Sequence, residues 1–171
     1  AVSGLRLAGL IAPFEYEPAH FLKAPALLKK LDGLDWLQRA AFAELLTGNR
    51  TKHIFYAVRA DNPVALPAPD QPGIVPVLRD LSVEEAVGLV PAGGTVTVSS
   101  DGLKTAFAVP ALARAIIGLC DGQRSLAAIH DAIRGKRTDL DWHAFQRQFA
   151  ELYTVMNGIN RMVLVKPATT R

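Results

Sequence analysis

The chain has 171 residues, half of them apolar, and a formal net charge of +3, which suits one ordinary domain or two small ones. No apolar run approaches the roughly 18 residues of a membrane span, and the charge excess is too small to demand a nucleic-acid partner. The single cysteine, Cys120, excludes an internal disulfide and is typical of a reducing compartment, so we expect a cytoplasmic protein. The chain begins without Met and without a signal-peptide pattern, which predicts that it is a piece of a longer protein.

The first third of the chain predicts a strand, two helices and a second strand. The apolar stretch 5–11 indicates the first strand, and Pro25 opens the first helix, because a missing N–H costs nothing at the first helical position. Residues 54–58 are continuously apolar and rich in β-formers, which predicts a strand buried on both faces. His53, at the edge of this strand, has no second ligand residue at metal spacing, so we expect it to be structural.

The second helix of this part begins after Asp35, which is a favourable N-cap residue, and ends at Gly48. Its apolar residues Leu37, Ala41 and Leu45 recur every four positions. This spacing places them on one face of the helix.

Residues 63–80 differ from the rest of the chain, because they are rich in proline and have almost no periodicity. This composition predicts a linker, or an extended arm packed over the surface. It is also the best domain boundary in the sequence. The prediction is therefore a first part over 1–62, a Pro-rich linker or arm over 63–80, and a second part over 81–171.

The second part predicts a short helix, a hairpin, three helices and a closing strand. Ser82 and Glu85 have the spacing of a capping box, which starts the short helix. The stretches 95–99 and 105–109 alternate between polar and apolar residues on either side of a turn at 101–102, Asp-Gly, which predicts a hairpin. One apolar side of this hairpin is expected to cover the helices that follow.

The three helices follow from their apolar spacing. The first is expected from Pro110, and Ser125 caps the second. The third has an aromatic-rich stripe over four turns, ends at Gly158, and is followed by a strand over 162–166. The predicted fold is therefore α+β: a small strand-helix-helix-strand part followed by a winged-helix-like unit of hairpin, three helices and closing strand.

The sequence contains no obvious catalytic or metal motif. Its four histidines are scattered, none forms a motif with Ser or Cys, and no Cys/His cluster could hold zinc. Phosphate-binding glycine motifs are also lacking. We therefore expect a chain without catalytic, cofactor-binding or metal-binding residues of its own.

Basic residues gather near the helix pair of the second part, and they are candidates for partner contacts: Arg114, Arg124, Arg134 and Arg137. A hairpin and a closing strand leave at least one sheet edge open to an extended segment. The basic rim would favour an acidic segment, chiefly by steering its approach. The alternative is that these residues form an ordinary solvated rim.

A helix-turn-helix core is also typical of DNA-binding proteins, whose second helix presents side chains to the bases. In this chain the predicted outward face of that helix holds Ala127, Ala128, His130 and Asp131. This face is short, mixed in charge and poor in Asn, Gln and Arg. A winged-helix DNA-binding regulator is therefore the alternative hypothesis, and a freestanding enzyme is more distant.

Two stretches resemble a known family. Residues 45–50, Leu-Leu-Thr-Gly-Asn-Arg, followed by a strand that ends in Arg59, resemble the methyltransferase regulatory domain of bacteria. Residues 119–129 are similar to the winged-helix-like region that follows this domain in bacterial protein-lysine methyltransferases. They are also similar to small domains that bind leader peptides in peptide-maturation pathways.

The resemblance implies a non-catalytic regulatory or substrate-presenting fragment of a bacterial class I methyltransferase. S-adenosylmethionine would then bind to a catalytic domain upstream, and not to this fragment. The implied partners are that catalytic domain or a protein substrate. We expect no membrane partner, and nucleic acid only under the DNA-binding alternative. The resemblance adds Asn49 and Arg50 to the candidates for partner contacts.

Overall fold

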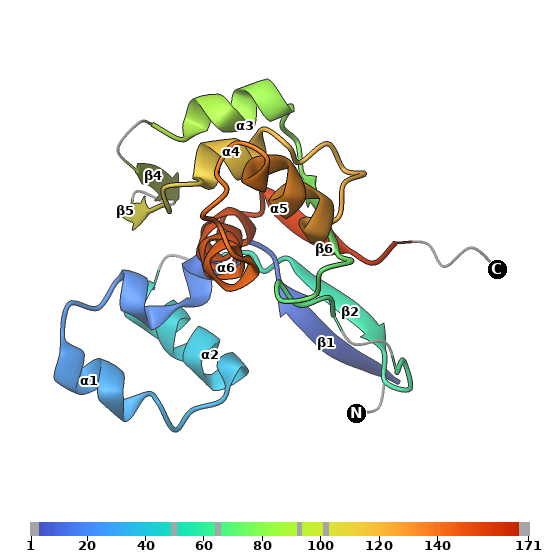
Figure 1. Cartoon of the computed structure of the whole chain (residues 1–171). Helices are drawn as coiled ribbons and strands as arrows, with labels where there is room; N and C mark the ends of the chain where they lie inside the picture. The colour runs from blue at the N-terminus through green and yellow to red at the C-terminus, as the bar shows by residue number, and fades with distance from the viewer. Residues whose placement is uncertain (1–3, 49–50, 64–65, 92–93, 101–102, 168–171) are drawn as a thin grey trace. The chain divides into compact units, whose positions relative to one another are not determined.

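A computed structural model of the chain describes residues 4–48, 51–63, 66–91, 94–100 and 103–167 (Figure 1). The fold is α+β, with helices and small antiparallel sheets, as the sequence predicts. The internal contacts divide the chain into two units. Unit 1 comprises 1–64 and 99–105, and unit 2 comprises 65–98 and 106–171.

Unit 1 contains the predicted strand, two helices and second strand, with two short 3-10 helices between the first strand and the first α-helix. Its elements are β1 (Leu5–Leu10), η1 (Pro13–Tyr16), η2 (Pro18–His20), α1 (Pro25–Lys30), α2 (Trp36–Thr47) and β2 (Phe55–Arg59). The predicted cap of α2 is confirmed: one carboxylate oxygen of Asp35 accepts hydrogen bonds from the backbone N–H groups of Leu37 and Gln38 at 2.9 and 2.8 Å. Gly48 ends the helix with a φ of 64°.

Strands β1 and β2 form an antiparallel pair in which Leu5 lies opposite Arg59 and Leu10 lies opposite Phe55. The expectation that β2 is buried on both faces is wrong, because Phe55 and Tyr56 are 54% and 48% exposed. Among the described residues, β2 pairs with β1 alone. A strand in such a ribbon lacks the covering layers that bury a central strand of a parallel sheet on both sides.

The predicted apolar face of α2 is exposed, although the apolar face of a helix is usually its buried face. Leu37 and Leu45 are exposed, and the buried residues of the helix are the small Ala40 and Ala43. These alanines let α2 lie close to η1 and η2, which it contacts.

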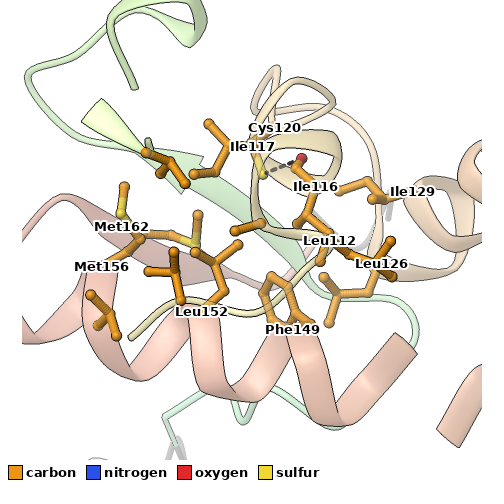
Figure 2. Packing of buried hydrophobic residues seen from close by; sticks show 14 of the residues in the cluster. Leu112, Ile116, Ile117, Cys120, Leu126, Ile129, Phe149, Leu152, Met156 and Met162 are labelled. Carbon is orange, nitrogen blue, oxygen red and sulfur yellow. Dashed lines mark hydrogen bonds between the residues drawn. The ribbon is translucent and has the colours of Figure 1, made fainter. Parts of the chain in front are cut away.

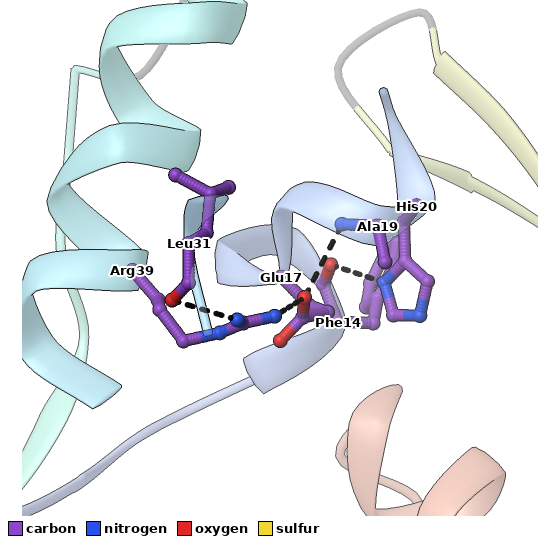
Figure 3. Close-up of polar contacts among 6 residues, drawn as sticks. All are labelled: Phe14, Glu17, Ala19, His20, Leu31 and Arg39. Carbon is purple, nitrogen blue, oxygen red and sulfur yellow. Dashed lines mark hydrogen bonds and ion pairs between the residues drawn. The ribbon is translucent and has the colours of Figure 1, made fainter. Parts of the chain in front are cut away.

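Polar contacts tie η1 and η2 to the helices of unit 1 (Figure 3). The Arg39 guanidinium donates to a Glu17 carboxylate oxygen at 2.5 Å and to the Leu31 carbonyl at 3.3 Å. The same Glu17 oxygen accepts from the Ala19 N–H at 3.2 Å and so caps η2. These contacts connect segments that supply few large buried side chains.

Unit 2 has the predicted order of short helix, hairpin, three helices and closing strand, preceded by a strand. Its elements are β3 (Val75–Leu78), α3 (Val83–Leu89), β4 (Thr95–Ser100), β5 (Leu103–Ala108), α4 (Ala113–Ile117), α5 (Leu126–Arg134), α6 (Trp142–Gly158) and β6 (Met162–Val165). Strands β4 and β5 pair as predicted. The Asp-Gly turn predicted between them, 101–102, lies outside the described residues. The described residues 99–100 and 103–105 of the hairpin are grouped with unit 1.

The stretch predicted as a linker or arm, 63–80, contains β3, which pairs with β6 from Val75 opposite Val165 to Leu78 opposite Met162. Ile74, just before β3, is 2% exposed, and its carbonyl accepts from the N–H of Leu126 at 2.8 Å. The second half of this stretch is therefore part of the unit 2 core. Pro76, within β3, is itself fully buried, and the Pro72 carbonyl accepts from the N–H of Ala127 at 2.9 Å.

The core of unit 2 forms where α4, α5 and α6 pack on one another (Figure 2). Ile116, Ile129 and Phe149, one from each helix, are completely buried. Most of the predicted stripe of α6 is confirmed: Phe145, Phe149, Leu152 and Met156 are at most 1% exposed, whereas Trp142 at its start is partly buried. Helix α4 begins later than predicted, at Ala113, because Pro110 starts a turn in which its carbonyl accepts from the Ala113 N–H.

Candidate partner-binding pocket

Unit 2 contains a pocket of about 470 Å³ between the end of α3, the base of the hairpin and the start of α4. Its lining comes from two loops and one helix: Val90, Pro91, Gly94, Val109, Pro110, Ala111, Ala113 and Arg114. Most of these side chains are apolar, and Arg114 brings the one charged group. The pocket therefore offers an apolar surface with a positive charge at its wall.

Local hydrogen bonds hold the walls of this pocket in place. Arg114 donates from Nη1 to the Val90 carbonyl at 3.0 Å, which connects α4 to the end of α3. The N–H of Val109 donates to the Gly94 carbonyl at 2.8 Å, which closes the base of the hairpin. Gly94 has a φ of 80°, and a Cβ there would lie 3.0 Å from the Val109 carbonyl oxygen, so this approach requires glycine.

Arg114 determines the chemistry that the pocket can recognise. A guanidinium carries five N–H donors in a planar fork, and the bond to Val90 uses one of them. The remaining donors suit a carboxylate, which Arg binds through paired hydrogen bonds. An acidic group next to an apolar side chain therefore matches both the charge and the walls of the pocket.

The four predicted arginines do not form one cluster. Arg114 lines the pocket, whereas Arg124 lies in the α4–α5 turn beside Asp121, with 3.5 Å between its Nε and a carboxylate oxygen. Arg134 is in the last turn of α5, and Arg137 follows in the loop, where its N–H donates to the Arg134 carbonyl. Helix α5 separates Arg124 from Arg134 by about 12 Å or more, given a rise of about 1.5 Å per residue.

The two remaining candidates, Asn49 and Arg50, lie outside the described residues. The turn at Asp121 is held by hydrogen bonds to its side chain. Its carboxylate accepts from the backbone N–H groups of Arg124 and Gln123, each at 2.9 Å. These two bonds lower the pKa of Asp121, and the bond from the Arg124 N–H has the larger effect. Arg124 therefore sits beside a carboxylate that stays ionised, which partly neutralises its charge for a partner.

The outward face of α5 is poorer in polar groups than predicted, because His130 is buried. The ring is 7% exposed and packs edge-on against Trp142, with ring centres 5.5 Å apart. Its Nε2 lies 3.2 Å from the Leu140 carbonyl. The prediction of an outward His130 is wrong, although its position four residues after Leu126 and one after Ile129 already places it on the apolar side.

Cys120 is a buried residue and not a reactive one. Its Sγ donates to the Ile116 carbonyl at 3.3 Å (Figure 2). Burial raises its pKa to about 12, with a further contribution from the charge of Asp121. The thiolate is the nucleophilic form of cysteine, so this side chain stays unreactive at neutral pH.

In unit 1 the structure brings together three polar side chains that the sequence did not connect. His53 Nδ1 lies 3.2 Å from the Tyr16 hydroxyl, and His53 Nε2 lies 3.3 Å from a Glu44 carboxylate oxygen. Tyr16 is buried, whereas the other two are partly exposed. These contacts join η1, α2 and the segment before β2, which agrees with the structural role predicted for His53.

Nucleotide-like cofactors often bind at a glycine-rich loop between a strand and the next helix, so the two loops of this kind in unit 2 were compared with that pattern. The loops between β3 and α3, residues 79–82, and between β5 and α4, residues 109–112, contain no glycine. Within the described ranges, no group of three or more His, Cys, Asp or Glu side chains is arranged to hold a metal ion.

No described helix combines the length and apolar character that crossing a membrane requires.

Comparison with protein-family models and with curated proteins gives no match to this chain. The resemblance to the methyltransferase regulatory domain therefore stays a prediction from the residues at 45–50, 59 and 119–129.

Proposed function

We propose that this chain is a non-catalytic, regulatory or substrate-presenting part of a bacterial S-adenosylmethionine-dependent methyltransferase that works in the cytoplasm, and that unit 2 binds a polypeptide. The pocket beside Arg114 is the main support for the proposal that unit 2 binds a polypeptide. It combines apolar walls with a guanidinium that has donors to spare. The residues at 45–50 and 119–129 support the methyltransferase part.

The proposed partner is an acidic segment that also carries an apolar side chain. Arg114 would hold its carboxylate, and the more exposed lining residues Pro91, Pro110 and Ala111 would receive the apolar group. The segment would belong to the upstream catalytic domain or to a protein substrate. S-adenosylmethionine would bind to the upstream domain, since the strand-to-helix loops described above lack the glycine-rich turn that nucleotide-like cofactors use.

Fluorescence polarisation tests this binding directly. The probe is a fluorescein-labelled peptide, Gly-Glu-Leu-Leu-Glu-Gly, and Gly-Lys-Leu-Leu-Lys-Gly is the charge-reversed control. We expect the acidic peptide to bind more tightly, and Arg114→Gln to weaken its binding about tenfold, because a charge-assisted bond is lost. Arg134→Gln is the matched control, because it removes an equal charge outside the pocket.

Equal effects of the two substitutions would remove the pocket from the mechanism. Arg114→Lys keeps the charge without the fork and is expected to lie between the wild type and Arg114→Gln. Melting temperatures of all variants show whether loss of the Val90 contact disturbs the fold.

Two further measurements test the class of protein. Calorimetry with S-adenosylmethionine is expected to show no micromolar binding to this chain, and such binding would contradict the proposal. Tight DNA binding that weakens steeply with salt would favour the DNA-binding alternative, because phosphate contacts release counterions. The full-length gene product is expected to contain a strand-Gly-x-Gly-helix motif upstream.

A further inference from the structure

One side chain of helix α6 holds the start of α4. The backbone N–H of Leu112 donates to Oε1 of Gln148 at 3.0 Å. Leu112 is the N-cap residue of α4, and its N–H is one of the donors for which a helix offers no acceptor of its own. Since Leu112 is only 3% exposed, water is a poor substitute for the Gln148 oxygen, and a buried N–H without an acceptor lowers stability. Helix α4 therefore takes this acceptor from α6.

The loop between β5 and α4, residues 109–112, is fixed at both ends. At its first end the N–H of Val109 donates to the Gly94 carbonyl, within the base of the hairpin. At its second end the acceptor belongs to α6, and this helix is firmly placed, because Phe149, the residue after Gln148, is completely buried in the core (Figure 2). The first end depends on backbone atoms and the second on one side chain. Gln148 is therefore the point at which a substitution can release the loop.

This loop forms one wall of the pocket beside Arg114. Pro110 and Ala111 line the pocket from the loop, and Arg114 follows in the first turn of α4. Ala111 is exposed and Pro110 is half-buried, so core packing holds them less firmly than it holds Ile116, which is completely buried. A carboxylate and a neighbouring apolar side chain can bind together only when this wall and the guanidinium keep their spacing. Holding that spacing in advance lowers the entropy that is lost on binding.

We infer that Gln148 is a positioning residue of the pocket, which keeps the Pro110–Ala111 wall in place for a polypeptide bound at Arg114. Gln148 does not itself line the pocket, so it acts through the loop. This role rests on the proposed function, because it concerns the same pocket and the same acidic partner. It adds to the site a residue from a helix that contributes nothing to the pocket lining.

Hydrogen exchange and peptide binding test this role together. Gln148→Met keeps the length of the side chain and removes the acceptor. We expect the Leu112 amide to exchange at least about tenfold faster, and the acidic peptide Gly-Glu-Leu-Leu-Glu-Gly to bind about fivefold more weakly, because a buried hydrogen bond is lost. Gln146→Met is the matched control. Gln146 is also half-buried on α6, and two residues turn its side chain about 200° away from that of Gln148, so neither quantity is expected to change.

Two further variants separate the hydrogen bond from the bulk of the side chain. Gln148→Glu keeps an acceptor oxygen at the same distance, so the Leu112 amide should exchange as slowly as in the wild type. Gln148→Asn withdraws the oxygen by one methylene group and should resemble Gln148→Met in both measurements, which keeps the test available if the methionine variant does not fold. Rapid exchange in Gln148→Glu, or slow exchange in Gln148→Asn, would contradict the role of this acceptor.

Combining Gln148→Met with Arg114→Gln shows whether Gln148 acts through the pocket. If it does, its effect on the dissociation constant should shrink to less than about twofold once the guanidinium is absent, because residues in one network are not additive. Equal weakening in both backgrounds, as a general loss of the fold would produce, would overturn the role, and so would unchanged binding in Gln148→Met. Absence of peptide binding to the wild-type chain would instead contradict the proposed function itself, and this role with it.

Discussion

The two units of this chain differ in how many of their large apolar residues they bury. Unit 2 buries them in one cluster that extends from Ile74 to Leu164. Unit 1 buries mainly Phe14, Tyr16 and Leu31, together with small residues. Among the exposed large apolar side chains of the described residues, nine belong to unit 1 and three to unit 2.

This difference suggests a division of roles. A unit with a closed apolar core can fold by its own packing, and its surface is free to carry a site such as the Arg114 pocket. A unit whose apolar side chains remain in water has surface that a partner can still bury. Most of the apolar packing of the chain therefore lies in unit 2, whereas unit 1 keeps most of its large apolar side chains exposed.

Cutting the chain between the units is expected to have the largest effect. Residues 66–171 alone should unfold cooperatively, because they contain the whole apolar cluster. Residues 1–63 alone should lack a cooperative transition, since so small a segment with few buried large side chains cannot offset its chain entropy. Circular dichroism melts of both fragments check this. A cooperative transition in 1–63 would show that unit 1 has a sufficient core.

The second-largest effect is expected from placing a charge inside the apolar cluster of unit 2. Ile129 is completely buried. Ile129→Asp should lower the free energy of unfolding by about 4 kcal/mol or more, because it removes apolar packing and buries an unpaired carboxylate. Chemical denaturation of the full chain measures the loss. An unchanged midpoint would mean that α5 is rotated relative to the structure.

Alkaline pH should destabilise unit 2 through Cys120. Its pKa is raised to about 12 in the folded chain, from an ordinary value of 9.0. The stabilisation is therefore fully present below about pH 9 and is lost as the pH rises from 9 to about 12, because the unfolded thiol ionises while the folded one stays protonated. A disulfide reagent at pH 8 should react with the unfolded chain much faster than with the native chain. Rapid reaction of the native thiol would contradict its burial.

The smallest effect on folding is expected on the exposed apolar face of α2. Leu45→Asp should change the free energy of unfolding by less than about 0.5 kcal/mol, because Leu45 is 84% exposed and loses little packing. Its contrast with Ile129→Asp isolates the difference between the units, since both replace an aliphatic residue by Asp on a helix. A loss comparable to that of Ile129→Asp would place Leu45 in a core.

The candidate site was predictable only in part. Arg114 was among the predicted partner contacts, and the structure places it in the pocket wall. Arg124 and Arg134 have the same chemistry and lie equally near the helix pair in the sequence. Asp121 is only three residues before Arg124, so that contact is local, whereas nothing near Arg114 in the sequence reveals that it shares a pocket with Val90 and Gly94. Closeness in sequence does not measure closeness in space once a helix intervenes.

The sequence by itself determined the features that depend on near neighbours. Asp35, Ser82 and Ser125 cap the helices that follow them, because a cap bonds to N–H groups two or three residues away. Only the tertiary structure decided the pairing of β3 with β6 and the exposure of β2. An apolar strand has the same sequence whether a layer covers it or not, and its hydrogen-bond partner lies far along the chain, so both outcomes depend on how distant segments pack.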